Sequence, residues 1–340
     1  MKSAPRWPAR SPPLLPAEDH EALGALLVLG VLATATLSLF IGVADFSLAP
    51  LGWPDEAQAR LTLLWVSRVP RSLALVFAGA ATAVAGLIMQ MLLRNRYIEP
   101  AMVGTVEGAC LGMLLALIVA PGIPVFGRML MAFVGAIAVT GLFLAILSRL
   151  PLRSVLIVPL TGIILAGIVD AATNFIAFNF ELQQSLAAWR LGDFAQVLSG
   201  RWELLWLAFA LTLVAAFVAD RFTIAGLGRD TATSLGLNHR RVMALGLVIV
   251  SAVSASVVVT VGVIPFLGLV VPNLVSLVSG DNLRRAVPLT ALAGALFALV
   301  CDVLGRLLNW PFEVPIGVII GIVGSATFLW ILARERRRLG

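Results

Sequence analysis

Long stretches almost free of charged side chains recur along the whole chain, and they limit its fold more than any other feature. A helix needs about 20 apolar residues to cross the roughly 30 Å hydrocarbon core of a membrane. Stretches long enough to be considered are Ala22–Ala44, Ser72–Leu93, Gly108–Gly127, Met129–Ser148, Ser154–Phe180, Leu204–Ala219, Val242–Gly280, Ala286–Arg306 and Val314–Ala333. Because 60% of the residues are hydrophobic and only 12% are charged, an ordinary soluble domain is excluded. The chain is predicted to be an all-α, multi-pass membrane protein.

The stretch Val242–Gly280 is about twice as long as one crossing requires. Gly262, Pro265, Gly268 and Pro272 offer places for a break, so we count two helices here and about ten in the chain. An even number of crossings places both termini on the same side of the membrane. We therefore expect an N-terminal tail over residues 1–21, a transmembrane domain over residues 22–333 and a basic C-terminal tail over residues 334–340.

The distribution of basic residues tests this topology independently, because cytoplasmic segments carry an excess of Lys and Arg. With the N-terminus inside, the outer segments hold seven of the 24 basic residues, and the inner segments hold the other 17. The seven outer residues are Arg60, Arg68, Arg71, Arg128, Arg190, Arg201 and Arg306. Both termini are therefore predicted to be cytoplasmic, and the basic pI reflects topology rather than nucleic-acid binding.

The residues needed for common catalytic sites are missing. The only lysine is Lys2, so no nucleotide-binding loop of the GxxxxGK[ST] type can form. His20 and His239 are far apart, and Cys110 and Cys301 lie in apolar spans, where packing explains them best. We expect no catalytic residue, no metal site and no cofactor. If ATP drives a process here, another chain must hydrolyse it.

Two carboxylates, Glu107 and Asp170, lie in apolar spans, and Asn174 is one helical turn from Asp170. A carboxylate within a membrane usually faces the bundle interior or a watery cavity. These residues could line a pathway or couple transport to protons. They could equally hold helices together by hydrogen bonds, and no basic partner for them is evident in the spans.

Three arginines lie at the expected outer ends of spans, against the usual bias. Arg68 and Arg71 precede the second span in the sequence RVPR, and Arg306 ends the ninth. A basic cluster that faces outward suits an acidic partner surface. The alternative is that these side chains anchor the ends of the helices in the membrane interface.

The segment Thr223–Arg241 (TIAGLGRDTATSLGLNHRR) is a polar island between two apolar runs. Gly226 and Gly228 permit a turn into a short helix, near whose N-terminus Asp230 is favourable, and Gly236 suits the helix end. Ala232 and Leu235 are expected to put small apolar contacts on one face. The pattern predicts a short amphipathic helix on the cytoplasmic side.

Five blocks in order resemble one family, the permease subunits of bacterial iron-siderophore, haem and vitamin B12 importers, which are type II ABC importers. The blocks are Arg68–Asn95, Glu99–Ala109, Gly226–Val242, Gly262–Arg306 and Glu313–Leu332. The resemblance implies a subunit of ten transmembrane helices in the bacterial inner membrane. It also implies a dimer around a central pathway, formed with a second copy or a paralogous permease.

The resemblance assigns partners to the features described above. An ABC ATPase dimer binds from the cytoplasm, and Gly226, Asp230, Ala232, Leu235 and Gly236 match the segment that docks on it. A periplasmic or lipid-anchored siderophore-binding protein delivers the substrate. Arg68, Arg71 and Arg306 match the arginines that meet acidic residues on the two lobes of this binding protein. A cytoplasmic gate is expected near Ser154 and Val155.

The motif combination looks most like the subgroup that handles catecholate-type ferric siderophores. The leading hypothesis is a permease subunit that imports such a chelate and has no enzymatic activity of its own. The alternative is a proton-coupled secondary transporter that uses Glu107 or Asp170, which would leave the island at residues 223–241 unexplained.

Overall fold

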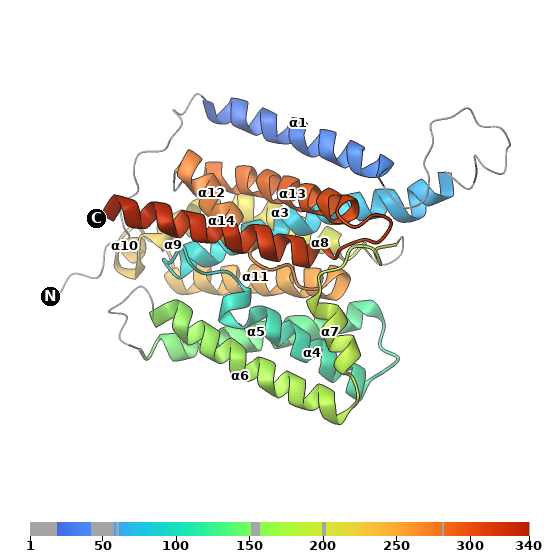
Figure 1. Cartoon of the computed structure of the whole chain (residues 1–340). Helices are drawn as coiled ribbons and strands as arrows, with labels where there is room; N and C mark the ends of the chain where they lie inside the picture. Colours follow the sequence, from blue (N-terminus) through green and yellow to red (C-terminus); the bar gives the residue numbers. More distant parts are fainter. Residues whose placement is uncertain are drawn as a thin grey trace.

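The computed structural model describes residues 19–41, 58, 61–150, 157–198, 202–280 and 282–339, and within these ranges it contains no strand. The predicted all-α fold is confirmed (Figure 1). A π-helical segment, η1 (Leu64–Arg68), runs directly into α3, and a 3-10 turn, η2 (Ala101–Val103), precedes α4. The α-helices are α1 (Asp19–Phe40), α3 (Val69–Leu92), α4 (Thr105–Val119), α5 (Val125–Leu147), α6 (Ile157–Asn179), α7 (Gln183–Arg190), α8 (Leu205–Phe217), α9 (Ala219–Gly226), α10 (Arg229–Ser234), α11 (His239–Val261), α12 (Leu267–Ser279), α13 (Leu283–Leu307) and α14 (Ile316–Leu339).

Seven helices of the described chain are long and apolar enough to cross a membrane. The pair α8–α9 meets the same test only as a unit and is bent by 64°, and α4 and α12 are shorter apolar helices. Each of the ten predicted segments overlaps one of these helices or the bent pair. Length and composition therefore support a multi-pass membrane protein, and the count of ten crossings stays a prediction.

Two helices differ most in extent from the predicted spans. The second span was expected to begin at Ser72, but its helix already begins at Leu61, so that Arg68 and Arg71 lie inside it. The third was expected to reach Gly127, but α4 ends at Val119 and α5 begins at Val125. Two prolines, Pro121 and Pro124, lie between α4 and α5, and proline cannot continue a helix because it lacks the backbone N–H.

The predicted break in Val242–Gly280 is confirmed. Helix α11 ends at Val261, α12 begins at Leu267, and residues 262–266 between them are not helical. Gly262 and Pro265 make the break. Gly262 has a φ of 83°, and Pro265 lies just before α12. Pro272 lies within α12 and does not interrupt it.

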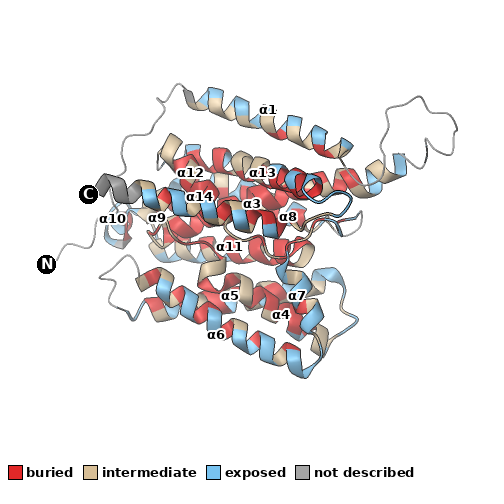
Figure 2. Ribbon diagram, viewed as in Figure 1, coloured by how far each residue is buried: buried red, intermediate tan, exposed pale blue. Residues whose placement is uncertain are grey.

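Helix α3 forms the centre of the bundle because it is rich in small residues that let other backbones approach. A Cβ atom on Gly86 would lie 1.9 Å from the carbonyl oxygen of Gly268 in α12. A Cβ atom on Gly79 would lie 2.6 Å from the carbonyl oxygen of Gly294 in α13. Most of α3 is buried, whereas almost none of α1 is buried (Figure 2). The core is therefore built around α3, α12 and α13, and α1 packs on α13 from outside.

Helices α4, α5 and α6 form a second group, which α11 joins to α3 through its contacts with α5 (Figure 1). Helix α10 lies at the end of the bundle where α14 finishes, and α7 lies at the opposite end, near the connection from α13 to α14. The bundle thus has two distinct ends. One presents the polar island, and the other presents the arginines expected to face outward.

Candidate functional site

The polar island forms the short helix that its sequence predicts. Helix α10 covers Arg229–Ser234, Gly228 at its start has a φ of 108°, and Gly236 just after its end has a φ of 79°. Both glycines adopt backbone angles that other residues rarely reach, so they fix where the helix begins and ends. The segment is therefore a defined structural unit rather than an irregular loop.

The two apolar residues expected on one face of this helix are in fact separated. Ala232 is fully buried, whereas Leu235 is 62% exposed and lies beyond the last helical residue. Asp230 is exposed. The helix is too short to carry both residues on one face, so Leu235 and Asp230 are available to a partner, and Ala232 packs inward.

The island rests directly on the end of α3. A Cβ atom on Gly228 would lie 3.1 Å from Nη1 of Arg94, and one on Gly226 would lie 3.3 Å from Cε of Met91. Arg94 itself has a φ of 52° and begins the segment that leads from α3 to α4. The start of α10 therefore lies close to this segment, while the helix itself packs on α9 and α11.

At the opposite end, Arg71 binds two carboxylates of its own chain. Its Nη2 donates to Asp302 at 2.7 Å, and its Nη1 donates to Glu313 at 2.6 Å. The side chain of Asp302 is 1% exposed and that of Glu313 is 25% exposed. Arg71 thus connects α3 to α13 and to the loop before α14.

Arg306 and Arg68 are also bound internally. Arg306 pairs with Asp302 and donates to the backbone oxygens of Ser38 at 3.0 Å and Ile41 at 2.7 Å. Arg68 donates to the backbone oxygen of Leu39, and both arginines are less than 10% exposed. Backbone oxygens at the end of α1 therefore bind both of these guanidinium groups. Their role in docking stays a prediction.

The carboxylate on α6 does have a basic partner. Arg190, the last residue of α7, pairs with Asp170, and the amide of Asn174 donates to the Asp170 carboxylate at 3.1 Å. The predicted neighbourhood of Asp170 and Asn174 is confirmed. The sequence reading missed Arg190 because it lies in the segment after the span, 20 residues further along the chain.

A cavity of about 320 Å³ lies between α4, α6 and α7 beside this pair. Glu107, in the first turn of α4, faces the same cavity, and its Oε2 is buried without a hydrogen-bond partner among the described residues. The lining residues are Val106, Glu107, Cys110, Asp170, Thr173, Arg190 and Val263. The structure therefore brings Glu107, Asp170 and Asn174 together, as residues of one polar region.

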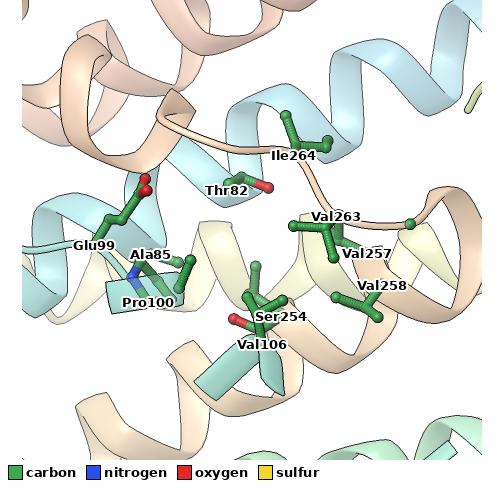
Figure 3. A pocket seen from close by; sticks show the side chains of 13 residues that line it. Thr82, Ala85, Glu99, Pro100, Val106, Ser254, Val257, Val258, Val263 and Ile264 are labelled. Carbon is green, nitrogen blue, oxygen red and sulfur yellow. The ribbon is translucent and has the colours of Figure 1, made fainter. Parts of the chain in front are cut away.

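A further carboxylate, Glu99, is buried where the sequence analysis assigned no role. It lies between α3 and α4, is 6% exposed, and accepts the backbone N–H of Phe266 at 3.2 Å. A cavity of about 30 Å³ separates it from Thr82 and Ile264 (Figure 3). The only signal in the sequence was a glutamate before Pro100, and such a pair is also common on surfaces. The expected gate residues Ser154 and Val155 lie outside the described residues.

Comparisons with known proteins agree over nearly the whole chain. Residues 26–334 match the FecCD transport family. The chain is 42% identical over 302 residues to the petrobactin import system permease protein YclN of Bacillus subtilis, covering 89% of this chain and 95% of the relative. It is 35% identical over 308 residues to the ferric-anguibactin transport system permease protein FatD of Vibrio anguillarum, covering 91% and 98%.

A solved structure has the same fold. An inward-facing metal-chelate type ABC transporter aligns with a TM-score of 0.79 and 24% identity over 92% of this chain and 99% of that chain. The family match spans all five sequence blocks that carried the resemblance. It confirms the expected role of a transport protein rather than an enzyme. The chain belongs to the FecCD transport family.

Proposed function

We propose that this chain is the permease subunit of an ATP-driven importer that carries a ferric siderophore of the catecholate type into the cytoplasm. Its relatives are named for petrobactin and anguibactin import, and the first of them is 42% identical across almost its full length. In this proposal the protein lies in the bacterial inner membrane and pairs with a second permease. It receives its cargo from a substrate-binding protein on the outer side.

The observation that carries the proposal is α10 in a chain that cannot bind ATP by a nucleotide-binding loop. The helix is bracketed by Gly228 and Gly236, rests on the end of α3 and exposes Asp230 and Leu235 at one end of the bundle. Such a surface suits the cleft of a separate ATPase. Gly226, Asp230, Leu235 and Gly236 are proposed to form the docking segment, with Ala232 supporting it from below.

Arg68, Arg71 and Arg306 are proposed to act at the docking surface for the binding protein, with Arg71 the most accessible of them. Its side chain is 14% exposed, and its partner Glu313 is 25% exposed. Acidic side chains of an incoming protein could therefore compete with Glu313 for Arg71. The cavity beside Asp170 and Arg190 is proposed to border the import pathway.

The proton-coupled alternative is not favoured. The family match points to a permease driven by a partner ATPase.

The first experiment is a gentle detergent purification of the tagged protein, followed by identification of every chain that co-purifies. A P-loop ATPase in equal amount is expected, and the reconstituted complex should import ferric petrobactin only with ATP. A preparation that contains no ATPase and still transports would refute the proposal.

A further inference from the structure

Glu99 lies in a segment that joins two functional parts of the molecule. Residues 93–104 lead from α3 to the beginning of α4, and a Cβ atom on Gly228, at the start of α10, would lie 3.1 Å from Nη1 of Arg94 in this segment. Glu99 is buried in this segment, and its Oε1 accepts the backbone N–H of Phe266 at 3.2 Å. This bond crosses from the segment that supports α10 to the break between α11 and α12.

The backbone that Glu99 holds is in an unusual conformation. Phe266 has a φ of 60°, which is uncommon for any residue other than glycine and costs free energy unless the surroundings impose it. Phe266 is also the residue that precedes α12. A carboxylate at this position is favourable because the N-terminal end of a helix carries partial positive charge. Glu99 therefore fixes both the backbone of Phe266 and the start of α12.

Other hydrogen bonds run parallel to this one. The side-chain amide of Asn273 in α12 donates to the backbone oxygen of Arg96 at 2.8 Å, and Gln90 donates to the backbone oxygen of Gly268 at 3.4 Å. We call these contacts and the Glu99–Phe266 bond the polar seam. Because the seam ties α12 to residues 90–99 at several points, the two cannot move independently.

At the start of the break, the chain is bound to α7 and to the residues that follow α7. The backbone N–H of Val263 donates to the oxygen of Trp189 at 2.9 Å, and that of Asp193 donates to the oxygen of Val261 at 2.9 Å. Trp189 is adjacent to Arg190, which lines the cavity together with Asp170. A continuous set of hydrogen bonds and packed residues thus leads from α10 through Glu99 to this cavity.

We propose that Glu99 is a positioning residue that passes movement of α10 to the break between α11 and α12, and from there to α7 and the cavity. The inference rests on the proposed function, in which an ATPase acts on α10. Glu99 contacts neither ATP nor the cargo in this scheme. Its carboxylate makes residues 262–266 move together with residues 93–104. ATP hydrolysis and cargo movement therefore stay coupled.

The test compares variants in the complete complex with its ATPase and binding protein, reconstituted in lipid vesicles with ferric petrobactin as the probe. ATP hydrolysis and iron import are measured on the same sample. E99L has a similar volume but no acceptor, so it leaves the Phe266 N–H unpaired. We expect imported iron per ATP to fall by about tenfold, a usual size for a coupling effect, while ATP hydrolysis changes little. E99Q keeps an acceptor oxygen, so it should retain most of the wild-type ratio of imported iron to hydrolysed ATP.

T82V is the matched control because Thr82 lines the same small cavity and its hydroxyl has no partner in the described chain. It should leave the ratio unchanged. A wild-type ratio in E99L would overturn the inference, and so would an equal loss of import and hydrolysis in E99L and E99Q. Wild-type complex that fails to bind an ATPase or to import would refute the proposed function instead, before any variant is compared.

If E99L does not assemble, the double variant E99L/F266G decides. Glycine adopts a positive φ without support, so the double variant should assemble and still import poorly per ATP. Assembly with a wild-type ratio would overturn the inference. Failure to assemble would also overturn it, because Glu99 would then serve folding alone.

Discussion

At the scale of single residues, the outer end of the bundle is organised by Asp302. This carboxylate is 1% exposed and pairs with both Arg71 and Arg306. Among the described residues, Glu313 pairs with Arg71 alone, and it is more accessible. Removing one partner of a buried ion pair leaves an uncompensated charge. The folded structure should therefore lose more stability without Asp302 than without Glu313, although both carboxylates bind Arg71.

We predict that D302A lowers the melting temperature of the purified protein far more than E313Q does. The first change leaves the buried guanidinium group of Arg306 without a carboxylate and removes one of the two carboxylates that bind Arg71; breaking a buried pair in this way typically costs about 3–5 kcal/mol. The second removes a partly exposed partner, for which about 1 kcal/mol or less is usual. Thermal unfolding in detergent measures both. Equal shifts would mean that Asp302 is not the centre of this network.

At the scale of helices and segments, glycines set how closely helices pack. Gly86 meets the backbone of Gly268 directly, so no side chain fits between α3 and α12. Gly141 in α5 has no atom within 4 Å of a Cβ built on it. The two positions are both helical glycines, yet only one of them is required by packing.

G86A is therefore expected to prevent folding of the bundle, because its Cβ would lie 1.9 Å from a carbonyl oxygen that cannot move away. G141A should be neutral or slightly stabilising, since alanine favours helices over glycine by about 1 kcal/mol. Size-exclusion profiles and yields of the two purified variants give the comparison. A well-behaved G86A would show that α3 and α12 can separate.

For the short helix α10, the prediction concerns binding rather than folding. Leu235 is 62% exposed, so L235D should leave the membrane domain folded and reduce capture of the ATPase by about tenfold or more, as for a central interface residue. L308D is the matched control, because Leu308 is 67% exposed at the other end of the bundle. Co-purification of the ATPase measures both. Equal capture by the two variants would remove Leu235 from the docking surface.

Much of the structure at the scale of helices and segments was predictable from sequence, because segment length, hydropathy and the positions of glycine and proline determine local structure. The break at Gly262 and Pro265 and the short helix after Gly228 were found in this way. Pairings between distant residues were not. Arg190 lies outside any span and shows no periodic relation to Asp170, and Asp302 is 231 residues from Arg71. Glu99 was missed for the same reason, since its partner is the backbone of Phe266.

At the scale of the whole molecule, the two ends of the bundle carry different chemistry. One end presents α10, and the other presents the loop between α13 and α14 (Figure 1). The ion pairs of Arg71 and Arg306 with Asp302 lie at this second end. If the first end is cytoplasmic, as the distribution of basic residues predicts, the second faces the substrate-binding protein. The topology can be tested by labelling because both native cysteines, Cys110 and Cys301, are buried.

We predict that a membrane-impermeant maleimide leaves the unaltered protein unlabelled. S234C, on α10, should react only in inside-out vesicles, and N309C, after α13, should react only in right-side-out vesicles. Both positions are exposed, so accessibility alone does not limit either reaction. Labelling of both variants from the same side would contradict the proposed orientation.

The contact between Gly86 and Gly268 also has an evolutionary consequence. Most packing defects can be repaired by a second substitution that makes room, but here the space is filled by main chain, which no substitution removes. Sequence drift is therefore blocked at Gly86 whatever the cargo or the partner, whereas a Cβ atom on Gly268 would lie 3.2 Å from the nearest atom. In a library of random variants selected for import, Gly86 should remain fixed while Gly141 diversifies.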